Sequence, residues 1–256
     1  MRLCQHHAEL YATDTHCHLE RFRRPQDVLA RSAEAGVRVI AVTSRPSDFR
    51  RLFPLYGRRK GVRLALGLHP LEVAKVDLES ELALFSVYAA HTSYIGEVGL
   101  DFSRDGRDSR PKQEKAFDAI MAIPGVAAKI LSVHSRGASR EVIASLRRAS
   151  ASRVVLHWFT GGLRDLDTAL DAGFYFSINP AMTRNTKGRT IIDRLTSARV
   201  LVESDGPYAR IDGREMEPRD VRLALGYLAG QWRMTPDEVA AQVAKNLRDL
   251  TGIVVE

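Results

Sequence analysis

Five short apolar runs of this 256-residue chain end in histidine or carboxylate side chains. These side chains are His16 and His18, then Glu97, His134 and His157, and finally Glu203 with Asp205. Imidazole and carboxylate groups are the ligands that zinc and similar divalent ions take from proteins. The residue types therefore predict a metal-dependent hydrolase.

The spacing within two of these runs adds a geometric expectation. Residues two positions apart on a β-strand project from the same face, so His16 and His18 should point together, as should Glu203 and Asp205. Asp14 shares the face of His16 and is expected to orient one imidazole. Asp205, nearest the strand end, is expected to bind metal and take a proton from the attacking water, whereas the deeper Glu203 is expected to orient a ligand.

Glu97 lies in the segment Gly96-Glu97-Val98-Gly99, where the two glycines are expected to leave backbone room for a close ion. A buried, isolated glutamate is costly, so Glu97 must be paired, protonated or bound to metal. His134 and His157, joined by Glu97, could supply a second metal position. Taken singly, each of these histidines is more typical of a hydrogen-bonded core residue than of a metal ligand.

Three further polar residues follow predicted strands. His69 could contact a substrate phosphate or a further metal, or it could belong to a simple turn. Arg136 shares the face of His134 and could clamp a phosphate, with a structural salt bridge as the alternative. Asp101 is expected to orient a loop rather than to bind metal.

Strand-length apolar runs alternate with segments of helical period along the chain. The expected strands span 11–17, 37–43, 63–67, 93–98, 129–134, 153–158, 174–178 and 199–203, and the expected helices span 25–35, 78–90, 111–121, 139–149, 164–171, 218–230 and 236–250. This order predicts an α/β fold, specifically a (β/α)₈ TIM barrel. A doubly wound sheet would place its crevice at one switch point, whereas here reactive residues end at least five strands.

The length suits one barrel, so we expect a single domain over residues 1–256, with 1–10 as a flexible leader that includes His6 and His7. Two cysteines are too few for a disulfide framework and favour a reduced cytoplasm. No apolar run is long enough to cross a membrane, and no membrane partner is expected.

The formal net charge is +7, and the sequence pI is about 9.6. Cations follow the apolar runs, namely Arg21, Arg23, Arg24, Arg45, Arg104, Arg107, Arg110, Arg136, Arg140, Arg184, Lys187 and Arg189. If the runs are parallel strands, these cations surround the C-terminal face of the barrel, where a polyanion would meet the site. The alternative is solvated loop charge without a role.

Six motifs, in this order, resemble those of the TatD family of metal-dependent deoxyribonucleases. They are Asp14-Thr15-His16-Cys17-His18, Gly67-Leu68-His69-Pro70, Gly96-Glu97-Val98-Gly99-Leu100-Asp101, His134-Ser135-Arg136, His157-Trp158-Phe159-Thr160-Gly161 and Glu203-Ser204-Asp205-Gly206-Pro207-Tyr208. The resemblance runs from about residue 11 to Asn246. Two features depart from the family pattern: the segment between Asp101 and His134 is short, and Ser204 replaces the usual threonine.

The resemblance implies a distorted TIM barrel that holds two divalent ions, which could be zinc, magnesium or manganese. His16, His18 and Asp205 would hold one ion, His134 and His157 the other, and Glu97 would bridge them. With Asp205 and Glu97 as catalytic groups, the implied activity is hydrolysis of DNA phosphodiester bonds, as an exonuclease on single-stranded DNA.

Three segments are most similar to the TatD-like branch of four-gene Qat anti-phage systems. These segments are 130–136, 157–159 and 176–182. This likeness implies a role in anti-phage defence and protein partners from such a system. Two other functions stay open, namely a metal-dependent hydrolase of small lactones, amides or phosphoesters, and a non-catalytic subunit that binds nucleic acid or a defence partner.

Overall fold

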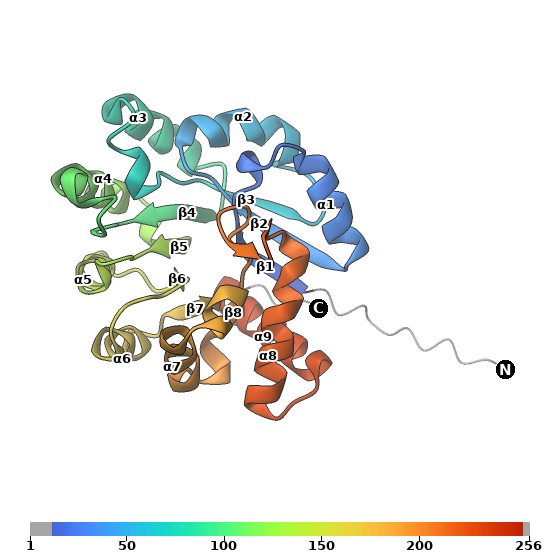
Figure 1. Cartoon of the computed structure of the whole chain (residues 1–256). Helices are drawn as coiled ribbons and strands as arrows, with labels where there is room; N and C mark the ends of the chain where they lie inside the picture. The colour runs from blue at the N-terminus through green and yellow to red at the C-terminus, as the bar shows by residue number, and fades with distance from the viewer. Residues whose placement is uncertain (1–11, 253–256) are drawn as a thin grey trace.

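Eight parallel strands alternate with helices in the computed structural model, which describes residues 12–252 (Figure 1). The strands are β1 (Ala12–Cys17), β2 (Val37–Val42), β3 (Val62–Ala65), β4 (Tyr94–Gly99), β5 (Ile130–His134), β6 (Val154–His157), β7 (Tyr175–Ile178) and β8 (Val200–Val202). Each predicted strand is present, within one or two residues of its expected bounds. The predicted leader 1–10 and the first residue of the first strand lie outside the described residues.

The helices follow one another around the outside of the strands (Figure 1). They are α1 (Pro25–Glu34), α2 (Pro46–Tyr56), α3 (Leu78–Ala89), α4 (Arg110–Ala122), α5 (Ser139–Arg148), α6 (Leu163–Asp171), α7 (Thr186–Arg194), α8 (Val221–Trp232) and α9 (Pro236–Thr251). The prediction of an α/β barrel is confirmed. It did not include α2 and α7.

The barrel is distorted because its backbone ladder divides into two parallel sheets, β1–β3 and β4–β8. The first gap, between β3 and β4, is crossed by Leu66, whose N–H donates to the Tyr94 carbonyl at 3.0 Å. At the second gap, between β8 and β1, the Asp205 N–H donates to the His16 carbonyl at 3.0 Å. The second crossing therefore joins the backbones of two candidate ligands directly.

The strands carry apolar side chains on both faces, as expected for parallel strands covered by helices. Val39 and Ala41 of β2 belong to the main core, whereas Ile40 and Ala65 point the other way and pack with Leu247 of α9. The end of the barrel near α9 is therefore filled with apolar side chains. Polar side chains are left to gather at the opposite, C-terminal ends of the strands.

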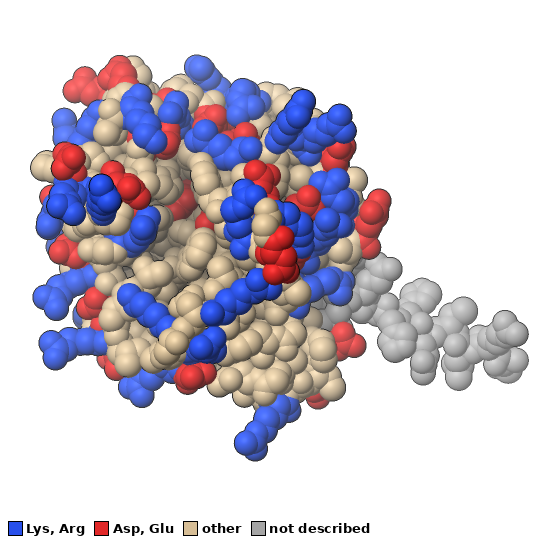
Figure 2. All heavy atoms as spheres, in the orientation of Figure 1, with Lys and Arg blue, Asp and Glu red and all other residues tan. Residues whose placement is uncertain are grey.

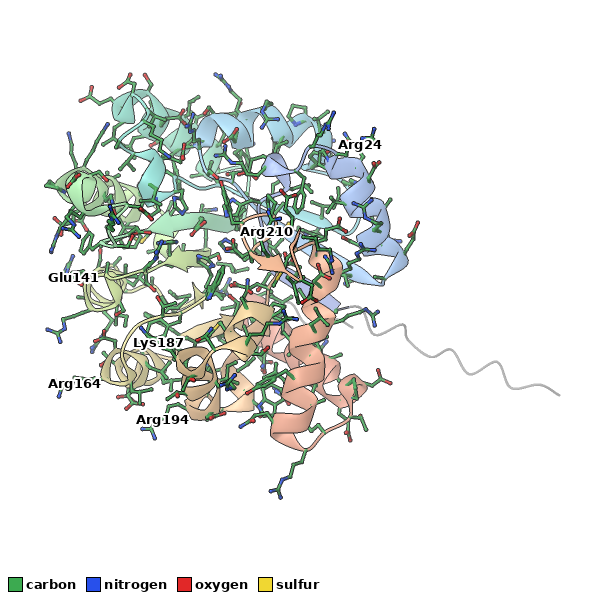
Figure 3. The ribbon with its side chains drawn as sticks, viewed as in Figure 1. Arg24, Glu141, Arg164, Lys187, Arg194 and Arg210 are labelled. Carbon is green, nitrogen blue, oxygen red and sulfur yellow. The ribbon has the colours of Figure 1, made fainter. Side chains whose placement is uncertain are left out.

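A short hairpin follows β8, formed by β9 (Arg210–Ile211) and β10 (Arg214–Glu215). In Figure 1 this hairpin lies in front of the barrel strands, and Figure 3 labels Arg210 at the same place, with Arg194 at the outer edge. Ala209, Ile211 and Met216 form a small apolar cluster against Trp158. The hairpin is thereby attached to the C-terminal end of β6.

Candidate metal centre

His16, His18 and Asp205 form one group of possible ligand atoms at the barrel mouth. The Nε2 atoms of the two histidines are 3.3 Å apart, and Asp205 Oδ1 lies 3.7 Å from each. All three residues are buried. Their ligand atoms are close enough to bind a single ion together.

A second group lies on the other side of Glu97. Oε1 of Glu97 is 2.6 Å from His134 Nδ1 and 2.8 Å from His157 Nε2, while its Oε2 is 2.9 Å from His18 Nε2. The rings of His16 and His157 stack with their centroids 3.9 Å apart. The carboxylate of Glu97 thus lies between the two groups, with one oxygen facing each.

Two residues at the strand ends have backbone conformations that non-glycine residues seldom adopt. Asp205 has φ +50°, and Trp158, directly after His157, has φ +35°. Such left-handed conformations cost free energy and persist where the surrounding structure holds them, commonly at functional sites. Asp205 lies three residues after the end of β8, and its Oδ1 is 3.7 Å from Nε2 of both His16 and His18.

The second ring nitrogen of each of the four imidazoles has its own polar neighbour. Nδ1 of His16 is 2.7 Å from Ser132 Oγ, Nδ1 of His18 is 3.3 Å from Glu20 Oε1, Nε2 of His134 is 2.9 Å from Asp101 Oδ2, and Nδ1 of His157 is 3.4 Å from Glu203 Oε1. The contact of His157 with Glu203 is at ion-pair distance only, since neither atom has a hydrogen-bond partner in the described chain. A ring nitrogen protonated toward such a neighbour leaves the opposite nitrogen able to bind a metal once that nitrogen has lost its own proton. These opposite nitrogens all face the space around Glu97 and Asp205.

This donor set fits a metal centre. Unprotonated imidazole nitrogens 3.3 to 3.4 Å apart repel one another unless a proton or a cation lies between them. Imidazoles mixed with carboxylates suit zinc and neighbouring transition metals, and carboxylates also accept magnesium or manganese. The residues present can therefore hold divalent ions on both sides of Glu97.

Neighbouring charge sets the protonation of the central carboxylate. Burial would raise the pKa of Glu97, but the imidazoles of His69 and His157, with hydrogen bonds from His134 and His157, hold that pKa well below its usual value. Burial, reinforced by His157, lowers the pKa of His16 well below its usual value. An ionised Glu97 and a neutral His16 are the forms that bind metal.

Asp205 and His18 have pKa values shifted toward or beyond neutrality. Burial raises the pKa of Asp205 to about 7, only partly offset by His157 and His18. Burial would lower the pKa of His18, but hydrogen bonds to Glu20 and Glu97 raise it to about 10. Both groups therefore hold their protons more tightly than an exposed aspartate or histidine would.

His69 ends near the same carboxylate, with Nε2 3.4 Å from Glu97 Oε1. Its Nδ1 accepts a hydrogen bond from the Leu71 N–H at 3.1 Å, so the neutral ring carries its proton on Nε2. Burial lowers the pKa of His69, which favours this neutral form. A ring with Nε2 protonated can donate to a phosphate oxygen but offers no lone pair to a metal there.

The structure gives Asp14 a contact different from the predicted one. Asp14 Oδ1 accepts the N–H groups of His16 and Ser204, each at 3.0 Å, and Oδ2 accepts the Ser204 hydroxyl at 2.5 Å. Instead of an imidazole, Asp14 holds the backbone of β1 against the end of β8. The sequence prediction missed this because it considered only side chains on one face.

Glu203 lies where the sequence analysis placed it, deeper than Asp205 and fully buried. Its Oε1 faces His157 Nδ1, and the Ser177 hydroxyl donates a short hydrogen bond to its Oε2. Asp101 contacts His134 Nε2 and also accepts the Ser103 N–H at 2.9 Å. It therefore orients both a loop and an imidazole.

The glycines that flank Glu97 have a packing role. A Cβ on Gly99 would lie 2.1 Å from the His134 carbonyl oxygen, and one on Gly96 would lie 2.8 Å from Ser132 Cβ. These glycines allow β4 to approach β5 closely. The expectation that they also leave room for an ion stays a prediction.

The face around the mouth carries many cations. Figure 2 shows it hollowed near the middle, with Lys and Arg side chains spread around the hollow. Arg136 is 57% exposed in its side chain and lies 3.5 Å from Asp105, and Arg184 pairs with Asp212. Some predicted cations of this face have no ion-pair partner among residues 12–252, namely Arg23, Arg104, Arg140 and Lys187.

Ser132 and Glu20 were not among the predicted site residues. Ser132 precedes His134 by two residues on β5, so the two-residue period of a strand could have placed it beside the ligands. Glu20 lies in a 3₁₀ turn, Leu19–Arg21, after β1, where strand periodicity gives no information. Its Oε2 is buried without a hydrogen-bond partner within the described chain.

An α/β barrel with histidine and carboxylate donors at the C-terminal strand ends belongs to the class of metal-dependent hydrolases. Comparison with known families makes the assignment specific, because the model described as TatD related DNase matches residues 13–252. The chain belongs to this family.

Relatives in the family agree with this assignment. The chain is 30% identical to the putative deoxyribonuclease tatdn3 of Danio rerio, over 91% of this chain and 94% of the relative. It is also 30% identical to the uncharacterized metal-dependent hydrolase YcfH of Escherichia coli, over 95% and 97%. The crystal structure of YjjV, a TatD homolog from Escherichia coli, superposes with a TM-score of 0.84 at 25% identity, over 95% of this chain and 98% of that one.

The described part of the chain contains no helix long and apolar enough to cross a lipid bilayer.

Proposed function

We propose that this enzyme hydrolyses the phosphodiester bonds of single-stranded DNA as an exonuclease that uses two divalent ions. The observation that carries the proposal is the orientation of the four imidazoles. One nitrogen of each faces Glu97 or Asp205, and the other lies beside a polar group of Ser132, Glu20, Asp101 or Glu203. His16, His18 and Asp205 would hold one ion, His134 and His157 the other, and Glu97 would contact both. When bound, the ions polarise the scissile phosphate and make an attacking water more acidic.

The residues of the chain then have separate tasks. Asp205, with its side chain 9% exposed, is placed to accept the proton of the attacking water. His69 donates from Nε2 to a phosphate oxygen beside Glu97, and the Arg136 guanidinium offsets negative charge on the phosphate. The exposed cations Arg104, Arg140 and Lys187 bind the phosphates of the remaining strand.

Cleavage by metal-stripped protein tests this proposal. The stripped protein should cut no DNA, and Zn²⁺, Mn²⁺ or Mg²⁺ should restore cleavage of an end-labelled single strand, with products shortened from one end. His134→Ala should lose this activity. The matched control His91→Ala changes an exposed histidine on the loop after α3 and should keep it. A clean preparation that is inert with every ion would refute the proposal.

We also propose a cytoplasmic role in anti-phage defence. This rests on the resemblance of three sequence segments to the Qat branch. The number of phage plaques should be lower on cells that carry the wild-type gene with its neighbouring genes than on cells that carry the same genes with Asp205→Asn. Equal plating on both strains would exclude a catalytic role in defence.

A further inference from the structure

One aromatic side chain at the mouth is unusually open to solvent. Large apolar side chains are exposed at six positions among residues 12–252, namely Leu55, Val87, Leu163, Tyr208, Leu223 and Met234. Tyr208 is 57% exposed and is the one aromatic residue among the six. It also lies three residues after Asp205, at the edge of the metal centre.

The ring of Tyr208 lies directly beside a metal-ligand candidate. Its centroid is 4.9 Å from that of His18, with the two planes at 80°. This edge-to-face contact is a favourable geometry for two aromatic rings and leaves most of the Tyr208 side chain uncovered. The uncovered ring is therefore adjacent to a residue that would hold one of the ions at the cleavage site.

The backbone on both sides of Tyr208 is held firmly. The Ala209 N–H donates to the Asp205 carbonyl at 2.9 Å, and the Met216 N–H donates to the Ala209 carbonyl at 2.9 Å. Ala209 is buried in the cluster with Ile211 and Met216. An exposed ring on a fixed backbone loses little conformational entropy when a ligand covers it.

Polar groups lie near the hydroxyl end of the ring. Burial raises the pKa of the Tyr208 hydroxyl, and Arg21 and Ser44 partly offset this effect. Arg21 Nε donates to Ser44 Oγ at 3.3 Å, so these two groups are themselves held together.

We infer that Tyr208 stacks on an unpaired nucleobase next to the scissile phosphate and so determines the preference of the enzyme for single strands. This inference rests on the proposed function. Nucleobases stack on aromatic side chains regardless of sequence, because every base has a π face. In a duplex the neighbouring base pairs cover these faces, so a strand that is already unpaired meets the ring at lower cost.

The test compares substrates with and without the base. Single-stranded oligonucleotides are prepared with a normal nucleotide, or with a base-free tetrahydrofuran nucleotide, at each of the two positions beside the cleavage site. KM and kcat are measured for the metal-loaded wild type, Tyr208→Leu and Tyr208→Phe. Leu223→Ala, an exposed apolar change on α8, serves as the control and should match the wild type.

Tyr208→Leu should raise KM about tenfold on the normal oligonucleotide, within the range expected for one base stacked on an aromatic ring. The difference between Tyr208→Leu and wild type should shrink to less than twofold when the base at one position is missing, and Tyr208→Phe should restore the wild-type KM. If Tyr208→Leu raised KM equally on the normal and the base-free oligonucleotides, Tyr208 would only support His18 and the inference would fail. An unchanged KM in Tyr208→Leu would also overturn the inference. If the wild type cuts neither oligonucleotide with any ion, the proposed function fails and the inference fails with it.

Discussion

Asp101 Oδ2 lies 2.9 Å from His134 Nε2, on the opposite side of the imidazole from Glu97. Burial would lower the pKa of His134, but Asp101 and Glu97 raise it above its usual value. Because Asp101 accepts the Nε2 proton, it directs the Nδ1 lone pair of His134 toward the metal position. Asp101 therefore acts on the metal centre through His134.

Asp101→Asn should weaken metal binding by about 10- to 100-fold, the usual effect of losing such an orienting partner. Affinity is measured by titrating the stripped protein with Zn²⁺ in competition with a chromophoric chelator. Asp108→Asn, an exposed change on the same loop, is the control and should bind as the wild type does. Unchanged affinity in Asp101→Asn would mean that His134 does not need this partner.

Asp205→Asn should lower kcat by at least about 100-fold, because the variant loses a proton acceptor together with a metal contact. The rate is followed on end-labelled single-stranded DNA at saturating metal. Asp212→Asn, an exposed change on the hairpin, should keep the wild-type rate. A fully active Asp205→Asn would remove this residue from the mechanism.

Metal should stabilise the fold, because it is expected to bind only where the buried ligands are brought together. At a free ion concentration of about 100 times Kd the gain is about 2.7 kcal/mol, equivalent to a rise in Tm of about 5 to 10 °C. Calorimetry of stripped protein with and without Zn²⁺ measures the shift. The Tm of the His16→Ala/His18→Ala double variant should rise less when Zn²⁺ is added. An identical Tm of the wild type with and without Zn²⁺ would argue against a preformed metal site.

The hairpin provides a pH-dependent contribution to stability. Asp220 accepts two hydrogen bonds of 2.7 Å from Arg214 and one of 2.8 Å from the Glu217 N–H. Burial would raise the pKa of Asp220, but these hydrogen bonds hold it below the usual 3.8. The folded state therefore binds the Asp220 proton less tightly than the unfolded chain, and the resulting stability is present above pH 3.8.

Asp220→Asn should lower the free energy of unfolding at pH 7 by about 1 kcal/mol, since Arg214 is half exposed. The difference from wild type should shrink as the pH falls from 5 through the lowered pKa, because protonation then removes the contribution from the wild type as well. Urea unfolding at each pH measures the difference in free energy of unfolding between the variant and the wild type. Asp108→Asn is the control and should match the wild type. A difference that stays constant with pH would show that Asp220 acts through packing.

The strands and the ligands were predictable for the same reason. Parallel strands buried on both faces leave continuous apolar runs in the sequence, and each run is followed by the residues of the C-terminal face. His16, Glu97, His134 and His157 could therefore be placed together without coordinates. Their partners Ser132 and Glu20 carry a weaker signal, because a serine within a strand is common and a 3₁₀ turn has no strand period.

Helix α2 was missed because Pro54 lies within it, which argues against a helix when the sequence is read alone. The structure accommodates Pro54 because the helix ends two residues later, at Tyr56, and buries Phe49 and Leu52. Helix α7 is short and buries only Gly188, Ile191 and Ile192. Its start depends on Asn185, whose side chain accepts the Gly188 N–H at 2.8 Å, a local contact that apolar periodicity does not report.

The proposed nuclease activity requires that the imidazoles and carboxylates around Glu97 bind two ions. Titration of stripped protein with Mn²⁺ or Zn²⁺ tests this requirement, with the ions bound per chain recorded together with the rate of cleavage of single-stranded DNA. Activity should rise with occupancy and reach its plateau at two ions per chain. Binding without cleavage, or cleavage by protein that holds no metal, would show that this centre does not cut DNA.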